Sequence, residues 1–237
     1  MDKQNTQSQV YNTMRKSILS LNLLPGTAIS ENEISQKFHV SRTPVRETFI
    51  KLEKECLIQI IPQKGTFVSL IDLDRVEQEY FLRRSLECSV IEQFIKKADD
   101  SNFAEMQKYI KLQKSFMEQK DYLHFIEYDD LFHKSIFEGA GQKLSWDLTE
   151  NFSGHYFRVR MLSIWQHGIA DNIVTQHKEL LDALKQHDLN MSKERLESHL
   201  LKLNDEKEML LTRFPDYFNT AKSKDNFAID FGGLNLS

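Results

Sequence analysis

The fold of the first part of the chain is decided by one stretch, Ser41-Arg42-Thr43-Pro44-Val45-Arg46-Glu47-Thr48-Phe49-Ile50-Lys51-Leu52. Val45, Phe49 and Leu52 recur at helical spacing, so one face of this helix packs inward and the basic residues stay outside. Ser41 is a suitable N-cap, and Pro44 is tolerated in the first turn, where its missing N–H has no helical partner. The exposed face therefore carries arginines near a helix N-terminus, which suits phosphate groups or the acceptor edge of guanine.

The residues on either side of this stretch predict a second helix and a hairpin. Residues 30–33 have the sequence of a capping box, so a short helix begins there and ends in a tight connection at residues 39–40. After the arginine helix, two β-prone runs flank residues 62–65, which have the composition of a turn. This order predicts a helix-turn-helix followed by a hairpin wing, with Lys64 and Gly65 at the tip of the wing.

These motifs resemble the winged helix-turn-helix of the GntR family of bacterial transcription regulators over residues 8–70. The resemblance implies that Arg42 and Arg46 contact the major groove, that Ser41 and Thr43 contact the DNA backbone, and that the wing approaches the minor groove. One departure is Asn32, where many members carry an arginine. The predicted DNA-binding set, with the exposed lysine of the arginine helix added, is Ser41, Arg42, Thr43, Arg46, Lys51, Lys64 and Gly65.

The charge of the chain is divided unevenly. Its 237 residues suffice for one large domain or two ordinary ones. Residues 1–70 hold nine Lys/Arg and six Asp/Glu, which gives +3, whereas the remainder holds 22 and 29, which gives −7. A basic small domain joined to an acidic larger one is typical of a DNA-binding unit with a separate control module, because phosphate neutralisation drives DNA affinity.

The hydrophobic segments and the cysteines indicate the cellular compartment. No run of about 20 apolar residues and no basic-then-apolar leader is present, so we expect a soluble cytoplasmic protein without membrane contact. Cys56 and Cys88 do not form a CxxC pair. Both are expected to be buried, unpaired thiols in a reducing compartment.

Beyond residue 70 the apolar spacing is helical. Asp72 is a suitable cap for a first helix that reaches Lys97, and further helices are predicted over 101–118, 121–138, 143–165, 169–187 and 191–213. From Pro215 the periodicity is lost, which predicts a loose tail. The expected fold is mostly α: a winged helix-turn-helix over 1–70, an all-α antiparallel bundle for effector binding and dimerisation over 71–213, and a tail over 214–237.

The bundle sequence contains a candidate metal site. Asp129 and His133 lie four residues apart, so they share a helix face and can bind one divalent cation together. His177 and His199 lie among apolar residues of later helices, where an unpaired imidazole is costly. A shared metal would satisfy all four side chains, although a hydrogen-bonded core position is the ordinary alternative for each histidine alone.

A second resemblance covers residues 72–212, which are similar to the all-helical C-terminal domain of the FadR subfamily within the GntR family. It is carried by residues 83–87, 129–133, 139–141, 177–180 and 198–200. In many members one Asp and three His bind a metal, and the matching positions here are Asp129, His133, His177 and His199. Such ligands suit Zn²⁺, Ni²⁺ or Mn²⁺ better than Ca²⁺.

The same resemblance implies a small carboxylate effector that ligates the ion while an arginine binds its other end. Arg83 is the candidate by motif position, and His155, Arg158 and Arg160 are candidate pocket liners. Gln142 departs from the asparagine that is common at its position, and the segment 151–164 departs in detail.

Together these features predict a metabolite-responsive bacterial transcription regulator, a repressor in the usual outcome for the family, and not an enzyme. A two-fold homodimer would bind a palindromic operator in double-stranded DNA. Two alternatives remain open: a metalloenzyme, and a helical metalloprotein with a structural metal and no small effector. The absence of an HExxH motif and of an obvious general base weighs against the enzyme.

Overall fold

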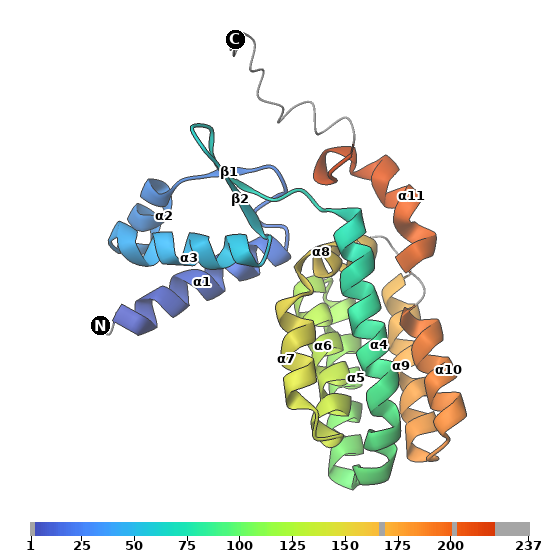
Figure 1. The fold of residues 1–237 in the computed structure, drawn as a ribbon. Coiled ribbons are helices and arrows are strands. Elements are labelled where there is room, and N and C mark those ends of the chain that lie inside the picture. The colour runs from blue at the N-terminus through green and yellow to red at the C-terminus, as the bar shows by residue number, and fades with distance from the viewer. Residues whose placement is uncertain (1–2, 166–168, 201–202, 221–237) are drawn as a thin grey trace, which may run out of the picture.

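A winged helix-turn-helix is joined to a helical bundle in the computed structural model of the chain (Figure 1). The structure describes residues 3–165, 169–200 and 203–220. Helices dominate, and the only sheet of the described residues is small and belongs to the first domain. The predicted fold class is therefore confirmed.

The first domain contains three helices and a three-stranded antiparallel sheet. The elements are α1 (Lys3–Leu19), β1 (Ala28–Ile29), α2 (Glu31–Phe38), α3 (Arg42–Lys54), β2 (Ile58–Ile61) and β3 (Gly65–Val68), with strand order β1-β3-β2. The predicted hairpin wing is β2 and β3, in which Ile58 pairs with Val68 and Ile61 with Gly65. The strand β1 was not predicted, because two residues are too short to show an alternating pattern.

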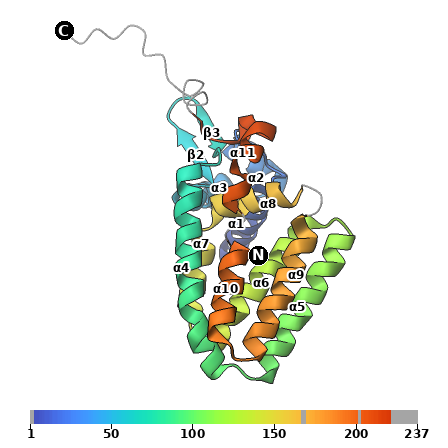
Figure 2. The same cartoon turned by 90° about the vertical axis from the view of Figure 1, so that its right-hand side faces the viewer.

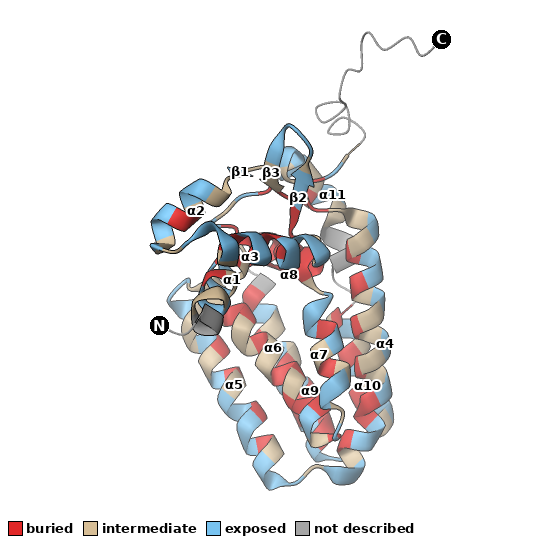
Figure 3. Cartoon of the chain, turned by 60° about the vertical axis from the view of Figure 1, so that its left-hand side comes forward, coloured by how far each residue is buried: buried red, intermediate tan, exposed pale blue. Residues whose placement is uncertain are grey.

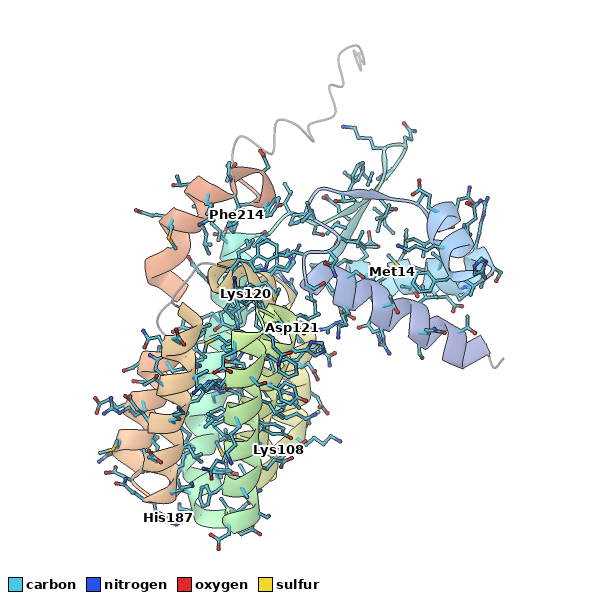
Figure 4. All side chains as sticks on the ribbon, turned by 180° about the vertical axis from the view of Figure 1, so that it is seen from behind. Met14, Lys108, Lys120, Asp121, His187 and Phe214 are labelled. Atoms are coloured by element: carbon cyan, nitrogen blue, oxygen red, sulfur yellow. The ribbon has the colours of Figure 1, made fainter. Side chains whose placement is uncertain are left out.

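The core of this domain lies between α1 and α3. Val45 and Leu52 of α3 are fully buried, and so is Ile18 of α1, as their helical spacing predicted. Met14, labelled in Figure 4, belongs to the same buried face of α1. Ser30 caps α2 by accepting a hydrogen bond of 3.1 Å from the Glu33 amide, which is the serine half of the predicted capping box.

The second domain is all-helical. Its elements are α4 (Leu73–Lys97), α5 (Asp100–Glu118), α6 (Tyr122–Gly139), α7 (Lys143–Asn151), α8 (Gly154–Ile164), α9 (Ile169–Lys185), α10 (Leu189–Leu200), α11 (Leu203–Arg213) and a 3-10 turn η1 (Pro215–Tyr217). Figure 2 shows α5, α6, α9 and α10 side by side, and the inner faces of these helices carry the buried residues (Figure 3). Asp72 caps α4 as predicted, accepting hydrogen bonds from the amides of Asp74 and Arg75.

Two predicted helices are divided in the structure. The segment 143–165 forms α7 and α8 with a break at residues 152–153, and the segment 191–213 is divided between α10 and α11. At the first break the chain turns, and α8 lies across the upper end of the bundle, next to the first domain (Figure 1). A Cβ atom on Gly154 would lie 2.7 Å from the Cδ2 atom at the end of the Leu57 side chain, so the backbone of α8 approaches the first domain closely here. The two domains therefore touch where α8 begins.

The prediction of a loose tail from Pro215 is wrong for the described part of that segment. Phe214, at the end of α11 (Figure 4), stacks on Tyr217 with ring centroids 5.5 Å apart. Phe218 is fully buried, and its neighbours Tyr217 and Asn219 hydrogen-bond to the backbone of Ile71. Residues 215–219 thus pack against the linker between the domains, and residues 221–237 lie outside the described part of the chain.

Two smaller expectations concern single residues and the membrane. Cys56 and Cys88 are free thiols, as predicted, but both are half-buried rather than buried. Within the described residues, no helix has the length and hydropathy needed to cross a bilayer.

Candidate metal centre and DNA-binding face

Three helices bring together the four residues that sequence analysis grouped. Asp129 and His133 come from α6, His177 from α9 and His199 from α10, and one ligand atom from each lies within 4.8 Å of the others. The three histidine Nε2 atoms form a triangle with sides of 3.2 Å. The Asp129 oxygens lie 3.5 Å from the His177 Nε2 and 3.8 Å from the His133 Nε2.

The Nδ1 atom of each of the three histidine rings faces an oxygen acceptor, and this contact indicates which ring nitrogen carries the proton. His133 Nδ1 lies 2.8 Å from Glu87 Oε2, and His177 Nδ1 lies 2.8 Å from the side-chain oxygen of Gln113. His199 Nδ1 lies 3.2 Å from the side-chain oxygen of Gln176. An oxygen of this kind accepts a hydrogen bond, so each Nδ1 carries the proton and each Nε2 turns a lone pair toward the others.

Three converging lone pairs are repulsive unless a cation lies among them. Burial lowers the pKa of His177 to about 3 and holds that of His199 well below its usual value, so neither of these two rings carries an extra proton near neutral pH. Nitrogens bonded to one ion at about 2.0–2.1 Å are about 2.9 Å apart at a right angle and about 3.3 Å apart at a tetrahedral angle. The observed spacing of 3.2 Å lies in this range. The residues therefore fit a divalent transition metal.

Two buried arginines adjoin the cluster. Arg83 Nε donates to Glu87 at 2.6 Å and its Nη1 donates to Asp130 at 3.1 Å. Arg160 donates to Asp129 at 2.5 Å through Nη2 and to Asp130 at 2.7 Å through Nη1. Burial opposes ionisation of Glu87, but His133 and Arg83 hold its pKa at about 2.

The electrostatics of Asp129 follow the same pattern. Burial alone would raise its pKa, but the Arg160 guanidinium and the neighbouring histidines keep that pKa far below the usual value. Arg83 and Arg160, two of the candidate effector residues, thus lie beside the Asp129 carboxylate. They can bind an anion that also reaches the metal cluster.

His155 and Arg158 do not reach this cluster, which corrects their assignment as pocket liners. His155 accepts a hydrogen bond from the Asp72 amide at Nδ1 and donates to the Cys56 carbonyl from Nε2, both at 3.0 Å. Arg158 donates to the Ser69 carbonyl at 2.6 Å. Both side chains therefore bind the linker and the DNA-binding domain. Arg160 is two residues further along the helix and so points the other way.

The beginning of α8 is fixed by a carboxylate that sequence analysis missed. Glu79 of α4 is buried and accepts hydrogen bonds from the amides of His155 and Tyr156 at 2.9 and 2.8 Å. Arg75 pairs with the same carboxylate at 2.8 Å. A carboxylate at a helix N-terminus satisfies free N–H groups and the helix dipole, so Glu79 holds α8 against α4.

The arginine helix presents its predicted face to solvent. Arg42, Thr43 and Arg46 are exposed, as are Lys64 and Gly65 at the tip of the wing. Ser41 occupies the N-cap position and is exposed, but its side chain makes no capping hydrogen bond.

Two side chains of the arginine helix have partners that were not foreseen. Arg46 pairs with Glu31 of α2 through two contacts, of 3.1 and 3.3 Å. Lys51 Nζ lies 3.4 Å from the centre of the Tyr11 ring of α1. Position 51 is half a turn away from Arg42 around the helix, and its side chain lies over a ring of α1. Lys51 is nevertheless exposed, so its predicted DNA contact stays a prediction.

Several residues of the site were missed by sequence analysis. The signal for Glu87 was its position four residues after Arg83, which makes an ion pair on one helix face. Gln113 is fully buried on an otherwise apolar face of α5. A buried side-chain amide needs a hydrogen-bond partner, and this was the available signal. Gln176 and Asp130 carried no signal beyond their positions next to His177 and Asp129.

Family comparisons cover both domains. The family model described as "Bacterial regulatory proteins, gntR family" matches residues 6–68, and the one described as "FCD domain" matches residues 78–202.

Individual relatives extend this similarity over nearly the whole chain. The HTH-type transcriptional repressor RspR of Escherichia coli (strain K12) is 32% identical over 216 residues, which cover 91% of this chain and 95% of that protein. The gluconate operon transcriptional repressor of Bacillus subtilis (strain 168) is 26% identical over 195 residues, which cover 79% of each. Among solved structures, E. coli McbR/YncC has a TM-score of 0.72 at 17% identity, covering 88% of this chain and 98% of that chain. At that identity the likeness concerns the fold alone.

Proposed function

The chain belongs to the GntR family of bacterial transcriptional regulators and carries an FCD domain, and from this premise we propose that it is a repressor released from its operator by a small carboxylate. Its relatives are named as transcriptional regulators, and it is not an enzyme. Because operator DNA lies in the bacterial cytoplasm, we place the protein there.

One observation carries the effector part of the proposal: three imidazoles turn their Nε2 atoms toward one another at 3.2 Å, beside Asp129 and two arginines. Asp129, His133, His177 and His199 would hold a divalent ion such as Zn²⁺, Ni²⁺ or Mn²⁺, which supplies a Lewis-acidic position for a carboxylate. Arg83 and Arg160 would bind the rest of the anion through their planar guanidinium groups.

DNA binding is assigned to the arginine helix and the wing. Arg42 and Arg46 would contact the major groove, with Ser41 and Thr43 on the backbone and the Lys64-Gly65 tip near the minor groove. The exposure of these residues supports the assignment. One such unit covers a short half-site, so a palindromic operator requires two copies related by a two-fold axis.

We propose that the second copy docks on the surface formed by Phe81 of α4 and by Leu144, Leu148 and Phe152 of α7, which we call the α4–α7 face. Phe81 is 69% exposed and Leu144 is 72% exposed, and the two helices lie side by side (Figure 1). Apolar side chains clustered on a surface mark an interaction site. Because residues 71–237 carry a net charge of −7, two copies repel each other less across apolar side chains than across charged ones.

Coupling between the two sites would run through α8. Every residue of this helix is buried, and its first turn is held by Glu79 and by the linker contacts of His155 and Arg158. Further along the same helix, Arg160 binds Asp129 and Asp130 at the metal cluster. An anion that changes the position of Arg160 would act on the linker through the rigid helix α8. It would shift the equilibrium between the DNA-bound and the released arrangement of the two domains by the difference in its affinity for them.

The proposal is tested on the purified full chain by elemental analysis and by selection of duplexes from a random library. We expect one transition metal per chain and an enriched palindrome. Changing His133, His177 and His199 together to alanine should abolish metal content and leave DNA selection intact, because α3 lies in the other domain. Full metal occupancy in this triple variant would overturn the metal site. Metal loading without any response to carboxylates would instead indicate a structural metal.

A further inference from the structure

The linker between the two domains is bound by the segment that follows α11. The linker spans residues 69–72, between the last strand of the wing and the first turn of α4. Both backbone groups of Ile71 are used: its amide donates to the Tyr217 carbonyl at 2.8 Å, and its carbonyl accepts from the Asn219 amide at 2.9 Å. These two contacts form a parallel β-bridge. We call residues 215–219 the C-terminal strap.

Phe218 anchors the strap to the bundle. Its side chain is fully buried, whereas Pro215 and Asp216 of the same segment are exposed. Phe218 lines a small cavity together with apolar residues of α4, α8 and α11, namely Leu73, Val76, Val159 and Leu210. Burial of a phenylalanine side chain strongly favours this docked position over an exposed one. The strap is therefore attached by side-chain packing, while its backbone binds the linker.

The other contacts of the linker come from α8. The Arg158 guanidinium donates to the Ser69 carbonyl at 2.6 Å, and the Asp72 amide donates to His155 Nδ1 at 3.0 Å. Among the described residues, the backbone of Ile71 hydrogen-bonds only to the strap. Without the strap its N–H and C=O would bind water, and its two backbone dihedrals would gain freedom. A rotation there changes the direction in which the DNA-binding domain leaves the bundle.

Beyond the linker, the DNA-binding domain meets the bundle partly through exposed polar contacts of α1. Lys16 pairs with Glu127 at 2.8 Å, with both side chains more than a third exposed, and Arg15 donates to the Glu150 carbonyl at 3.1 Å at an exposed position. Such contacts contribute little to holding one orientation. The more buried contacts involve residues 56–57, next to the linker. The direction of the DNA-binding domain therefore depends on how this linker region is held.

We propose that the C-terminal strap sets the spacing between operator half-sites that the protein accepts. Two DNA-binding domains on one palindrome must reach both half-sites at once, and a fixed linker allows this over a narrow range of spacings. With the strap released, each domain can turn and further spacings become acceptable. The strap lies beyond residue 202, where the FCD match ends, so the matched domain does not include it. This inference rests on the proposed operator-binding dimer and adds a determinant of its specificity.

Two variants release the strap: Phe218→Ala, and a chain that ends at Phe214. Hydrogen–deuterium exchange at Ile71, followed by mass spectrometry of overlapping peptides, should be at least about tenfold faster in both, because burial of one phenylalanine contributes at least this factor to the docked state. Asp216→Ala changes an exposed residue of the strap, and a chain that ends at Thr220 removes only residues outside the described part. Both of these controls should exchange as the wild type does.

The spacing is tested with duplexes from the random-library selection, by insertion of one base pair between the two half-sites. The wild type and both controls should lose at least about tenfold in affinity, because the second domain can no longer engage its half-site. The two strap variants should bind the original duplex more weakly than the wild type does, and should lose less than about threefold on insertion. Thermal melts confirm that each variant is folded.

The proposal is overturned if the strap variants keep the wild-type exchange rate at Ile71, or if the wild type itself tolerates the inserted base pair. It is also overturned if the strap variants exchange faster and still keep the wild-type spacing preference, since the strap would then stabilise the fold without a role in specificity. Selection of no operator with two half-sites by the wild type would overturn the proposed function together with the spacing role. The exchange measurement is made without DNA, so it separates failure of the strap from failure of the proposed regulator.

Discussion

Replacing Glu87 by glutamine should weaken metal binding while both domains stay folded. Glu87 is fully buried, with one oxygen 2.8 Å from His133 Nδ1 and the other 2.6 Å from Arg83 Nε. Glutamine has nearly the same shape but offers only one acceptor. Its NH₂ group must face a donor, either the imidazole N–H or the guanidinium. One of the two contacts is therefore lost whichever way the amide turns.

The expected magnitude follows from the position of Glu87 behind a ligand. Loss of a partner that orients a metal-bound histidine typically lowers metal affinity by about 10–100-fold, or about 1.4–2.7 kcal/mol. Breaking a buried ion pair outright costs about 3–5 kcal/mol of folding stability. Arg83 retains Asp130 as a partner at 3.1 Å, so we expect a smaller loss of stability than that.

Zinc affinity is measured by competition with a chromophoric chelator, together with a thermal melt of each protein. Glu92→Gln is the matched control, because Glu92 lies on the same helix but is exposed and pairs only with Lys96 among the described residues. We expect the control to bind zinc as wild type does. A Glu87→Gln protein that folds and keeps wild-type zinc affinity would refute the assigned role of the carboxylate.

Four further predictions concern other parts of the molecule. Arg46→Ala should lose operator specificity worth about 1–3 kcal/mol, and unchanged affinity in a gel-shift titration at fixed salt would contradict this. Lys64→Ala should weaken binding to all sequences and reduce the slope of log K against log salt by about one unit, whereas an unaltered slope would mean that the wing tip does not contact phosphate. Burial lowers the pKa of His155 to about 2, so below about pH 6.5 the unfolded chain binds one more proton than the folded chain and the free energy of unfolding falls with the pH. His155→Gln should reduce this fall by about 1.4 kcal/mol per pH unit in thermal melts at acidic pH. An unchanged slope of unfolding free energy against pH would refute this expectation. If two copies pair across the α4–α7 face as proposed, Phe81→Glu should be a monomer in sedimentation at a micromolar concentration where the wild type is a dimer, and a Phe81→Glu dimer would exclude this face.

Local patterns in the sequence determined the helices and the members of the metal cluster. The spacing of Val45, Phe49 and Leu52 specifies a helix with one buried face, and Asp72 begins a helix by satisfying its free amides. Asp129 and His133 share a face because they lie four residues apart. Each of these interactions joins neighbours in the chain, so the chain alone displays it.

Tertiary structure decided which buried polar residues belong to which site. His155, Arg158 and Arg160 lie within six residues of one another in α8, yet the first two bind the linker and only Arg160 reaches the metal cluster. Helical periodicity shows which way a side chain points only when one face of the helix is buried and another face meets solvent. Every residue of α8 is buried, so no such contrast exists along this helix.

The same reason explains the remaining corrections. Phe218 is buried because Ile71, far away in the chain, offers a backbone partner to its neighbours. The partners of Asp130 come from α4 and α8. The order of these helices in the chain does not predict that they pack against the same carboxylate. The sequence by itself identified the candidate metal-binding and DNA-binding residues, because candidacy depends on each side chain and its neighbours in the chain. Only the packing of helices that are distant in the chain decided which ion-pair or hydrogen-bond partner each buried charged side chain has. A charge removed from water must be paired, and the fold determines which group lies within bonding distance.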